Sequence, residues 1–388
     1  MDLEFNKSEW KEINLGCLAT EVSERVDKPS FSKFERFVGL EHFESGRLEI
    51  SNYSSTENLT SAAKVFKSGD VLFARRNVYL RRASSVTFDG ICSGDAFVLR
   101  ENPEVIEPGF LALLLNSNSL WNYAIANAAG TMSKRVKWRD LANFRVCLPP
   151  KVTQREIISL VWSNHSLINS NYQLLASTKA FQETYFENLV KDNASDRTKL
   201  RDVLTNIFAG KSPKGFSRPA NCDEYAVLKV SAVGNKKYVA TENKALIDQS
   251  EFNPIYEVQE GFILVTRANA NLSGVGRPCL VKSTRKGLML SDKTLRLIPD
   301  LEKVRNRFLY QLVQTKMYRQ YVESVAGGTE AKNISQKLLG NAPVWLPSME
   351  MQKEVESELF KQDEAIEAAE KHYINSKRLQ ASIINKVF

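Results

Sequence analysis

The sequence contains few residues of the kinds that form metal centres, disulfide frameworks or membrane spans. Its 388 residues include five cysteines and three histidines, and the cysteines stand far apart with no paired spacing. This spacing argues against a disulfide framework and a zinc site, so we expect buried free thiols and no metal. The longest apolar run, residues 110–115, is too short to cross a bilayer, and the first residues lack the pattern of a signal peptide. We therefore expect a cytoplasmic protein with no membrane partner.

Recognisable catalytic motifs are also scarce. Gly210, Lys211 and Ser212 look like the end of a phosphate-binding loop, but Thr205 stands where that loop needs a glycine for its tight turn. No strand-like run is followed by a glycine-rich turn of the type that binds a methyl donor, and no Asp-Pro-Pro-Tyr or Asn-Pro-Pro-Tyr segment is present. The histidines lie too far apart in the sequence to suggest a ligand set or a general base. We predict a chain that is not itself an enzyme and holds no cofactor.

One enzymatic alternative stays open. Asp300, Glu330 and Lys332 satisfy the loose carboxylate-plus-lysine pattern of metal-dependent nucleases, in which acidic oxygens hold magnesium beside the scissile phosphate. The pattern is permissive enough to arise by chance, and the aligned residues 132–134 of the first half lack the acid. A nuclease is therefore a weaker hypothesis than a non-catalytic chain.

The strongest positive signal is an internal duplication. Residues 144–150 and the following Gln154 return as residues 342–348 and Gln352, 198 positions later. The Gly-Thr pair at 130–131 returns at 328–329 with the same offset, and residues 67–75 resemble residues 259–267. A period this long does not fit a solenoid and predicts two whole domains of one fold. We place the parts at 1–148 (first domain), 149–192 (helix), 193–198 (linker), 199–346 (second domain) and 347–388 (helix).

Each half is predicted to end in one long helix. Pro150 and Pro347 stand where helices tend to begin, and neither proline nor glycine interrupts the residues that follow. Apolar residues recur every seven positions at equivalent places in both halves, which favours a partner helix, and the duplicate helix is the economical partner. Packing of each helix on its own domain is the alternative. The residues of this stripe are Val161, Ile168, Leu175, Leu359, Ile366 and Tyr373.

The domains ahead of these helices mix strands and helices. Short β-like runs come first in each half, and amphipathic stretches follow at 109–126 and 305–324. This order predicts an α+β fold for each domain.

The charge of the chain permits a nucleic-acid partner. The formal net charge is +8. Cations gather between residues 64 and 82, 134 and 139, and 199 and 218, whereas residues 350–370 are rich in Glu and Asp. A charge run is often only a solvated surface, but clusters at related places in both halves favour a shared role.

Taken together, the duplicated motifs resemble the specificity subunit of type I restriction-modification enzymes. The Leu-Pro segment before a Gln-containing helix, the Gly-Thr turn upstream, and the strand around residues 67–75 carry the likeness over nearly the full chain. Residues 200–213 look like the typical start of a target-recognition domain in this family. The first half departs from that pattern, because only residues 27–29 resemble it at the comparable place.

The resemblance implies a set of partners. Each of two target-recognition domains would recognise one half of a split double-stranded DNA sequence, and the two conserved helices would pair as an antiparallel coiled coil. Methyltransferase subunits, expected in two copies, would dock on these helices and carry S-adenosylmethionine and the adenine chemistry. ATP-dependent cleavage would belong to a further restriction subunit.

Candidate DNA-binding residues follow from the chemistry of recognition. Arg pairs well with guanine and Asn or Gln with adenine, while Lys, Ser and Thr hold phosphates. The aligned pairs Arg75 with Arg267 and Asn77 with Asn269 fit a shared role in recognition and equally a shared structural turn. A scaffold that recruits proteins through its helices and recognises no DNA is the second alternative. The candidates are Arg75, Arg76, Asn77, Arg81, Thr131, Ser133, Lys134 and Arg135 in the first half, and Lys211, Lys214, Arg267, Asn269, Asn271, Thr329, Lys332 and Asn333 in the second.

Overall fold

The chain folds into two compact units, each of which mixes helices and strands as predicted. The computed structural model describes residues 5–192, 197–234, 237–328 and 331–388. One unit consists of Met1–Leu175 with Ala368–Phe388, and the other of Ala176–Glu367. Within the described ranges, no helix is both long and apolar enough to span a membrane.

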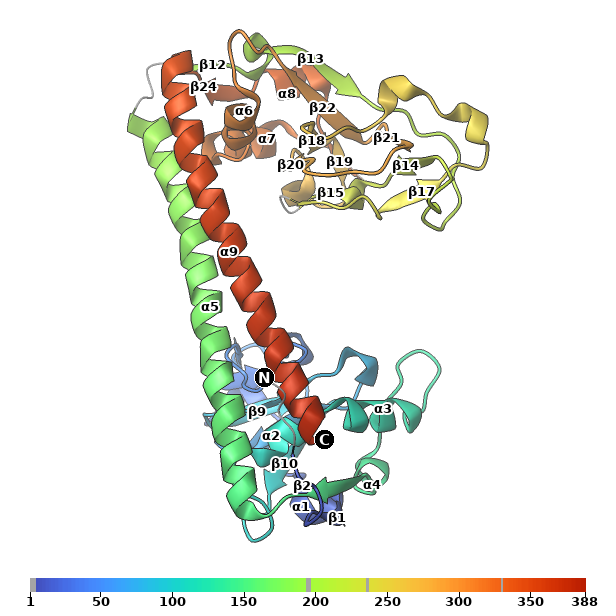
Figure 1. Ribbon diagram of the computed structural model, residues 1–388, viewed down its shortest axis with the longest axis vertical. Helices are drawn as coiled ribbons and strands as arrows, with labels where there is room; N and C mark the ends of the chain where they lie inside the picture. The colour runs from blue at the N-terminus through green and yellow to red at the C-terminus, as the bar shows by residue number, and fades with distance from the viewer. Residues whose placement is uncertain (1–4, 193–196, 235–236, 329–330) are drawn as a thin grey trace. The chain divides into compact units, whose positions relative to one another are not determined.

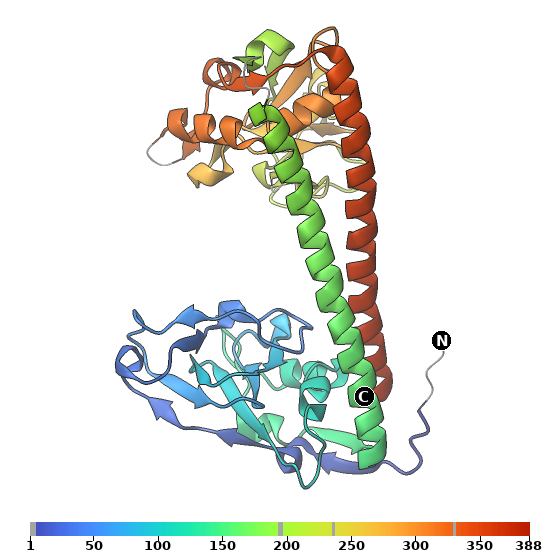
Figure 2. The same cartoon turned by 90° about the vertical axis from the view of Figure 1, so that its left-hand side faces the viewer.

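Each half of the chain ends in a long helix, α5 (Lys151–Asp192) or α9 (Met349–Val387). The helices pack on each other in both units and run side by side (Figure 1; Figure 2). In the first unit, Asn164 Nδ2 donates to Ser376 O at 3.0 Å. In the second unit, Gln182 Nε2 donates to Asp363 Oδ1 at 3.0 Å. Later residues of α5 meet earlier residues of α9, so the predicted antiparallel pairing is confirmed.

The seven-residue stripe on these helices serves two purposes. Val161 and Leu359, its first members, are fully buried in the cores of the first and second units. Ile168 is buried and lines a small pocket together with Tyr373 of the other helix. Leu175 and Ile366 are half-buried. The first member of each stripe therefore packs on its own domain, whereas Ile168 of α5 and Tyr373 of α9 line the same pocket.

The far end of each long helix completes the core of the unit that belongs to the other half of the sequence. Ile384 of α9 is buried in the first core, and Phe186 of α5, which stands 198 positions earlier, is buried in the second. The polar residues that follow Ile384 and Phe186 make equivalent hydrogen bonds. Asn385 Oδ1 accepts from the backbone N–H of Asn118 at 2.7 Å, and Glu187 Oε1 accepts from that of Lys316 at 2.5 Å. The duplication therefore extends to the last turns of both helices.

The first domain is built from strands followed by short helices. Its elements are β1 (Lys11–Asn14), α1 (Leu15–Leu18), β2 (Ala19–Val22), β3 (Arg25–Val26), β4 (Arg36–Val38), β5 (Ser54–Ser55), β6 (Ala63–Phe66), β7 (Val71–Ala74), β8 (Ala83–Ser85), β9 (Gly90–Ser93), β10 (Ala96–Glu101), α2 (Phe110–Leu114), α3 (Asn118–Ala126), α4 (Trp138–Leu141) and β11 (Arg145–Leu148). The sheets have the orders β2-β10-β7-β8, β3-β6-β9-β4-β5 and β1-β11. All four residues of β7 are buried, which explains its uninterrupted apolar sequence.

The second domain repeats this plan. Its elements are β12 (Arg197–Lys199), β13 (Leu204–Ala209), β14 (Ala226–Leu228), β15 (Val233–Gly234), β16 (Lys237–Tyr238), β17 (Asn243–Ala245), β18 (Ile263–Thr266), β19 (Ala268–Asn269), β20 (Pro278–Leu280), β21 (Leu288–Met289), β22 (Thr294–Pro299), α6 (Asn306–Leu312), α7 (Lys316–Val325), β23 (Lys332–Asn333), α8 (Gln336–Gly340) and β24 (Pro343–Trp345). The sheet β13-β22-β18-β20 corresponds to β2-β10-β7-β8, and β12-β24 to β1-β11.

The cysteines are free thiols, in agreement with the sequence. Cys92 and Cys279 are buried, but Cys17, Cys147 and Cys222 are exposed, so the expectation of burial is wrong for these three. Cys147 lies in β11, where exposed Arg145 and Cys147 alternate with buried Val146, and Cys222 lies between two exposed residues.

The glutamine of the repeated motif is buried at the start of each long helix, where it makes the same hydrogen bonds in both units. Gln154 Nε2 donates to Pro149 O at 2.9 Å, and its Oε1 accepts from the backbone N–H of Glu107 at 2.8 Å. In the second unit, Gln352 makes the same bonds to Pro347 O at 3.0 Å and to the N–H of Arg305 at 2.9 Å. The role requires a side chain that is donor and acceptor at once, which an amide supplies.

We predict that Gln352→Ala lowers the free energy of unfolding by about 1–3 kcal/mol, because it leaves buried backbone groups without partners. Urea titration of the full chain measures this loss. Lys353→Ala, one position further along the helix at an exposed site, is the matched control and should change the free energy of unfolding by less than about 0.5 kcal/mol. Equal losses in both variants would contradict the assigned role.

His165 of α5 is a buried titratable group in the first unit. It is 3% exposed and lines the small pocket with Arg47 and Gln380. Burial lowers the pKa of His165, and Gln380 and Glu49 oppose this shift only in part. The folded chain therefore binds a proton here less readily than the unfolded chain. This group's contribution to stability is complete above the ordinary histidine pKa of about 6.5 and is lost as the pH falls from there toward the lowered pKa.

We predict that the melting temperature of the chain falls between pH 7.5 and pH 5.5, and that His165→Leu reduces this fall because the variant has no imidazole to protonate at this position. Thermal melts at both pH values test the effect. His372→Leu, at an exposed position of α9, is the control and should keep the fall of the unaltered chain. An undiminished fall in His165→Leu would exclude His165 as its source.

Candidate nucleic-acid interface

In the first domain, two segments that are distant in sequence lie side by side at the end of β7. The backbone N–H of Asn77 donates to Lys134 O at 2.9 Å, and that of Val136 donates to Arg75 O at 3.1 Å. Between them, Arg76 and Arg135 face each other as an antiparallel bridge. The structure thus brings the predicted residues of segments 75–77 and 133–135 into one cluster.

The second domain builds the same frame at the end of β18. Strand β19 pairs with β23, so that Asn269 faces Lys332 and Ala268 faces Asn333. The backbone N–H of Ile334 donates to Arg267 O at 3.0 Å, which repeats the bond between Val136 and Arg75. Arg267, Asn269, Lys332 and Asn333 therefore lie together, whereas Thr329 lies outside the described residues.

The repeated Gly-Thr motif supplies the turn in this frame. Gly130 and Gly328 have φ angles of +121° and +134°, where residues with a side chain are strained. A Cβ at Gly328 would lie 2.1 Å from Ala331 O, and one at Gly130 would lie 3.1 Å from Ser133 O. Glycine is therefore needed for backbone geometry. Thr131, the residue after the first glycine, is exposed on this turn.

One carboxylate joins the arginines of the first cluster. Asp95 Oδ1 accepts from Arg135 Nε at 2.9 Å, and Asp95 Oδ2 accepts from Arg135 Nη2 at 3.3 Å and from Arg76 Nη1 at 3.4 Å. Arg76 Nη2 also donates to Ser133 Oγ at 3.3 Å. The hydrogen bond from Arg135 is the main reason that the pKa of Asp95 is lowered. Two predicted binding residues are therefore held by Asp95, an acid that no sequence motif singled out.

The loop that follows has an unusual backbone. Asn77 and Arg81 have φ angles of +53° and +50°, which is uncommon for residues other than glycine. The Arg81 guanidinium donates to Asn118 Oδ1 at 2.8 Å and to Asn122 Oδ1 at 3.3 Å, so it fastens the loop to α3. Tyr79, between the two, is 62% exposed. Tyr79 is not among the residues predicted from the sequence, although an aromatic residue among cations is a usable signal of a nucleic-acid interface.

The arginine of the second cluster has different neighbours. Arg267 Nη1 donates to the backbone oxygen of Asp292 at 3.3 Å. Asn269 Oδ1 accepts from the backbone N–H of Asn271 at 3.0 Å, and Lys332 Nζ donates to Gly328 O at 2.6 Å. The two domains therefore share a backbone frame and differ in the polar groups that it carries.

Lys211 adjoins the second cluster through the loop that contains it. Ser212 Oγ donates to Asp292 Oδ1 at 2.5 Å, and the backbone N–H of Lys211 donates to Leu290 O at 3.0 Å. A Cβ at Gly210 would lie 2.1 Å from Leu290 O, so this glycine allows the segments that follow β13 and β21 to approach closely. Lys214 is placed apart, where its carbonyl accepts from the backbone N–H of Ile247 at 3.1 Å.

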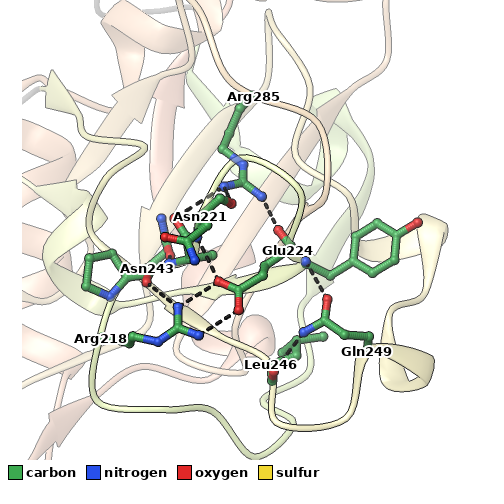
Figure 3. Close-up of polar contacts among 10 residues, drawn as sticks. Arg218, Asn221, Glu224, Asn243, Leu246, Gln249 and Arg285 are labelled. Carbon is green, nitrogen blue, oxygen red and sulfur yellow. Dashed lines mark hydrogen bonds and ion pairs between the residues drawn. The ribbon is translucent and has the colours of Figure 1, made fainter.

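Several other cations, in the basic clusters and outside them, have structural partners. Arg218 and Glu224 form a two-bond ion pair at 2.6 Å, which lowers the pKa of Glu224 to about 2, and Arg285 Nη1 donates to Asn221 O at 2.5 Å (Figure 3). In the first domain, buried Lys64 pairs with Glu21 at 3.0 Å. Cation counts along the sequence therefore overstate the charge available to a ligand.

Asp300 and Lys332, the two described residues of the alternative nuclease site, lie far apart. Asp300 follows the last residue of β22 and pairs with Lys303 at 3.0 Å. Lys332 lies beyond the opposite end of β22, where Thr294 pairs with Thr266. Six residues of strand span about 20 Å. Glu330 lies outside the described residues, and no cluster of three potential metal ligands occurs in the part of the chain that the structure describes.

Known proteins with similar sequences include specificity subunits of type I restriction enzymes. Residues 196–376 match the family described as type I restriction modification DNA specificity domain. The chain is 36% identical over 160 residues to the type I restriction enzyme EcoEI specificity subunit of Escherichia coli, a match that covers 40% of this chain and 27% of that relative's length. A match at 20% identity to the MjaVIII specificity subunit of Methanocaldococcus jannaschii covers 76% of this chain and 73% of that relative.

A solved structure shares the fold over almost the whole length. It comes from work on complex assembly and conformational transition of the type I R-M system. It superimposes with a TM-score of 0.56 at 21% identity and covers 97% of each chain. At this identity the likeness concerns the fold, including the duplicated domains with their long helices.

Proposed function

Because its second half matches the specificity domain and its first half repeats that fold, the chain belongs to the family of type I restriction-modification specificity subunits, and we propose that it recognises a bipartite DNA sequence. The resemblance predicted from the repeated motifs is thereby confirmed. One observation carries the proposal. The same two-segment frame in both domains presents arginine and asparagine side chains beside lysine, which are the groups that contact base edges and phosphates.

In this proposal, each domain recognises one half of the target. The frames are equivalent in backbone but carry different side chains, so the two half-sites would differ in sequence. Within each domain, the exposed lysines Lys134 and Lys211 would hold phosphates. Affinity for any duplex would then be salt-dependent, while discrimination would come from the arginine and amide groups.

The chain would supply recognition and leave the chemistry to its partners. Methyltransferase subunits, two in number because the chain is duplicated, would carry S-adenosylmethionine and methylate adenine, and restriction subunits would cleave. A docking surface for a methyltransferase subunit is offered by α5. Leu160 and Leu167 are 39% and 49% exposed at seven-residue spacing, on a different face from the buried Val161 and Ile168. Apolar side chains exposed at this spacing suit a partner helix.

Selection from a randomised pool of DNA duplexes tests the proposal. The full chain, with any subunits that co-purify, is expected to enrich two short motifs at one fixed spacing. Enrichment only in the presence of a methyltransferase subunit would support the proposal and make recognition dependent on that partner. No enrichment in either preparation would favour the scaffold alternative.

We predict that Arg267→Ala weakens discrimination at the second half-site by about 1–3 kcal/mol, because a good arginine-guanine pair contributes that much. Competition binding with duplexes altered in one half-site at a time measures the loss. Discrimination at the first half-site serves as the internal control and should not change. A uniform loss of affinity for all duplexes would instead assign Arg267 to a phosphate, and unchanged affinity would remove it from the interface.

A further inference from the structure

A single carboxylate stands in the middle of the first basic cluster. Asp95 accepts two hydrogen bonds from Arg135, at 2.9 and 3.3 Å, and one from Arg76, at 3.4 Å. The side chains of Arg76 and Arg135 are 42% and 41% exposed, and that of Asp95 is 21% exposed. The arginines face solvent while the acid lies behind them.

The backbone holds this acid in a fixed position. Asp95 lies in the turn between β9 and β10, one residue before Ala96, which pairs with Ala74 of β7. The carbonyl of Asp95 accepts from the backbone N–H of Arg75 at 3.0 Å, and its own N–H donates to Ser93 Oγ at 3.2 Å. The carboxylate is therefore anchored to the central sheet of the domain.

An acid at this place opposes simple binding of the DNA backbone. Phosphates are anions, so a surface that only held phosphates would bind better without the Asp95 carboxylate. The carboxylate also lets two like-charged guanidinium groups lie on directly facing backbone positions. The Asp95 carboxylate therefore reduces the net charge of the group formed with Arg76 and Arg135 from +2 to +1. It also fixes the directions of both guanidinium groups.

Arginine side chains held in fixed directions favour recognition of guanine. Arg135 uses Nε–H and one N–H of Nη2 for Asp95, which leaves both N–H groups of Nη1 and the second N–H of Nη2 for a ligand. Guanine offers two acceptors, O6 and N7, on one edge, and arginine is their usual partner. A guanidinium that is already held loses less conformational freedom on binding, so the pairing is stronger and more selective.

The second domain lacks this arrangement. Lys293 occupies the place of Asp95, as shown by the bond from the Arg267 N–H to Lys293 O at 2.8 Å. Arg267 bonds to a backbone oxygen of Asp292, and the Asp292 carboxylate accepts from Ser212 instead. Among the described residues of the two equivalent frames, only the first has a carboxylate that bridges two arginines.

We propose that Asp95 is a positioning residue that directs Arg76 and Arg135 toward guanine in the first half-site and restrains binding to other sequences. This inference rests on the proposed function. Asp95 itself contacts no base. Its role is exerted through the two arginines, and it gives the first domain a stricter preference than phosphate-binding cations would.

We predict that Asp95→Asn separates these two effects. Discrimination for guanine at the first half-site should fall at least tenfold, because the arginines are no longer held. Affinity for unrelated duplexes should rise, and the slope of log K against log salt should steepen by about one, because one negative charge is removed. The measurements are pool selection and salt titration of the full chain with its co-purifying subunits, and the second half-site is the internal control.

Two further variants guard against a purely structural effect. Arg135→Lys keeps the charge but cannot make the two-bond pair, so it should lose the guanine preference without steepening the salt slope. Lys293→Gln changes the charge at the equivalent place in the second domain and should leave the first half-site preference intact. Thermal melts of each variant show whether the fold is preserved.

Several outcomes would overturn the inference. One is a guanine preference at the first half-site that stays within twofold of the unaltered chain in Asp95→Asn or in Arg135→Lys. A second is a loss of preference at both half-sites in Asp95→Asn. A third is weaker binding of Asp95→Asn to every duplex. If the unaltered chain enriches a bipartite motif and these variants behave in that way, only the role of Asp95 fails. If the unaltered chain enriches no motif with or without its partners, the proposed function fails and the inference with it.

Discussion

Each domain core in this chain is completed by the end of a helix that begins in the other half of the sequence. Ile384 and Phe388 pack in the first core, and their equivalents Phe186 and Val190 pack in the second. Burial of an apolar side chain of this size contributes about 1.5–3 kcal/mol. The first unit is therefore built from two segments of the chain, whereas the second is the continuous stretch Ala176–Glu367, which includes the end of α5. The antiparallel pairing of α5 and α9 follows from the same closure.

The starts of the long helices are held by hydrogen bonds of buried glutamines. Gln154 and Gln352 each connect the helix start to the backbone that precedes the short helices of the domain. These bonds satisfy backbone groups that would otherwise be buried without partners. The start of each helix is thus fixed on its own domain and the end on the other domain, in both cases by contacts that the duplication preserves.

The two candidate interfaces show how a repeated frame can support different recognition. Backbone bonds from Val136 to Arg75 and from Ile334 to Arg267 are equivalent. The side chains on this frame are free to differ because the bonds that hold it are between backbone groups. Asp95 in one domain and Lys293 in the other are the clearest instance. Recognition of two half-sites of different sequence, as proposed, would follow naturally from this separation.

The sequence by itself determined the duplication, the α+β character of the domains and the two long helices, because repeats, prolines and apolar periodicity are visible along the chain. It also located the segments of the candidate interface. Only the tertiary structure decided which cations are available and which are held by acids. Arg135 meets Asp95 and Arg218 meets Glu224 through folding, and no periodic pattern records such pairings. The exchange of helix ends between the halves was likewise decided in three dimensions, since the burial of Phe186 and Ile384 depends on domains that lie elsewhere in the sequence.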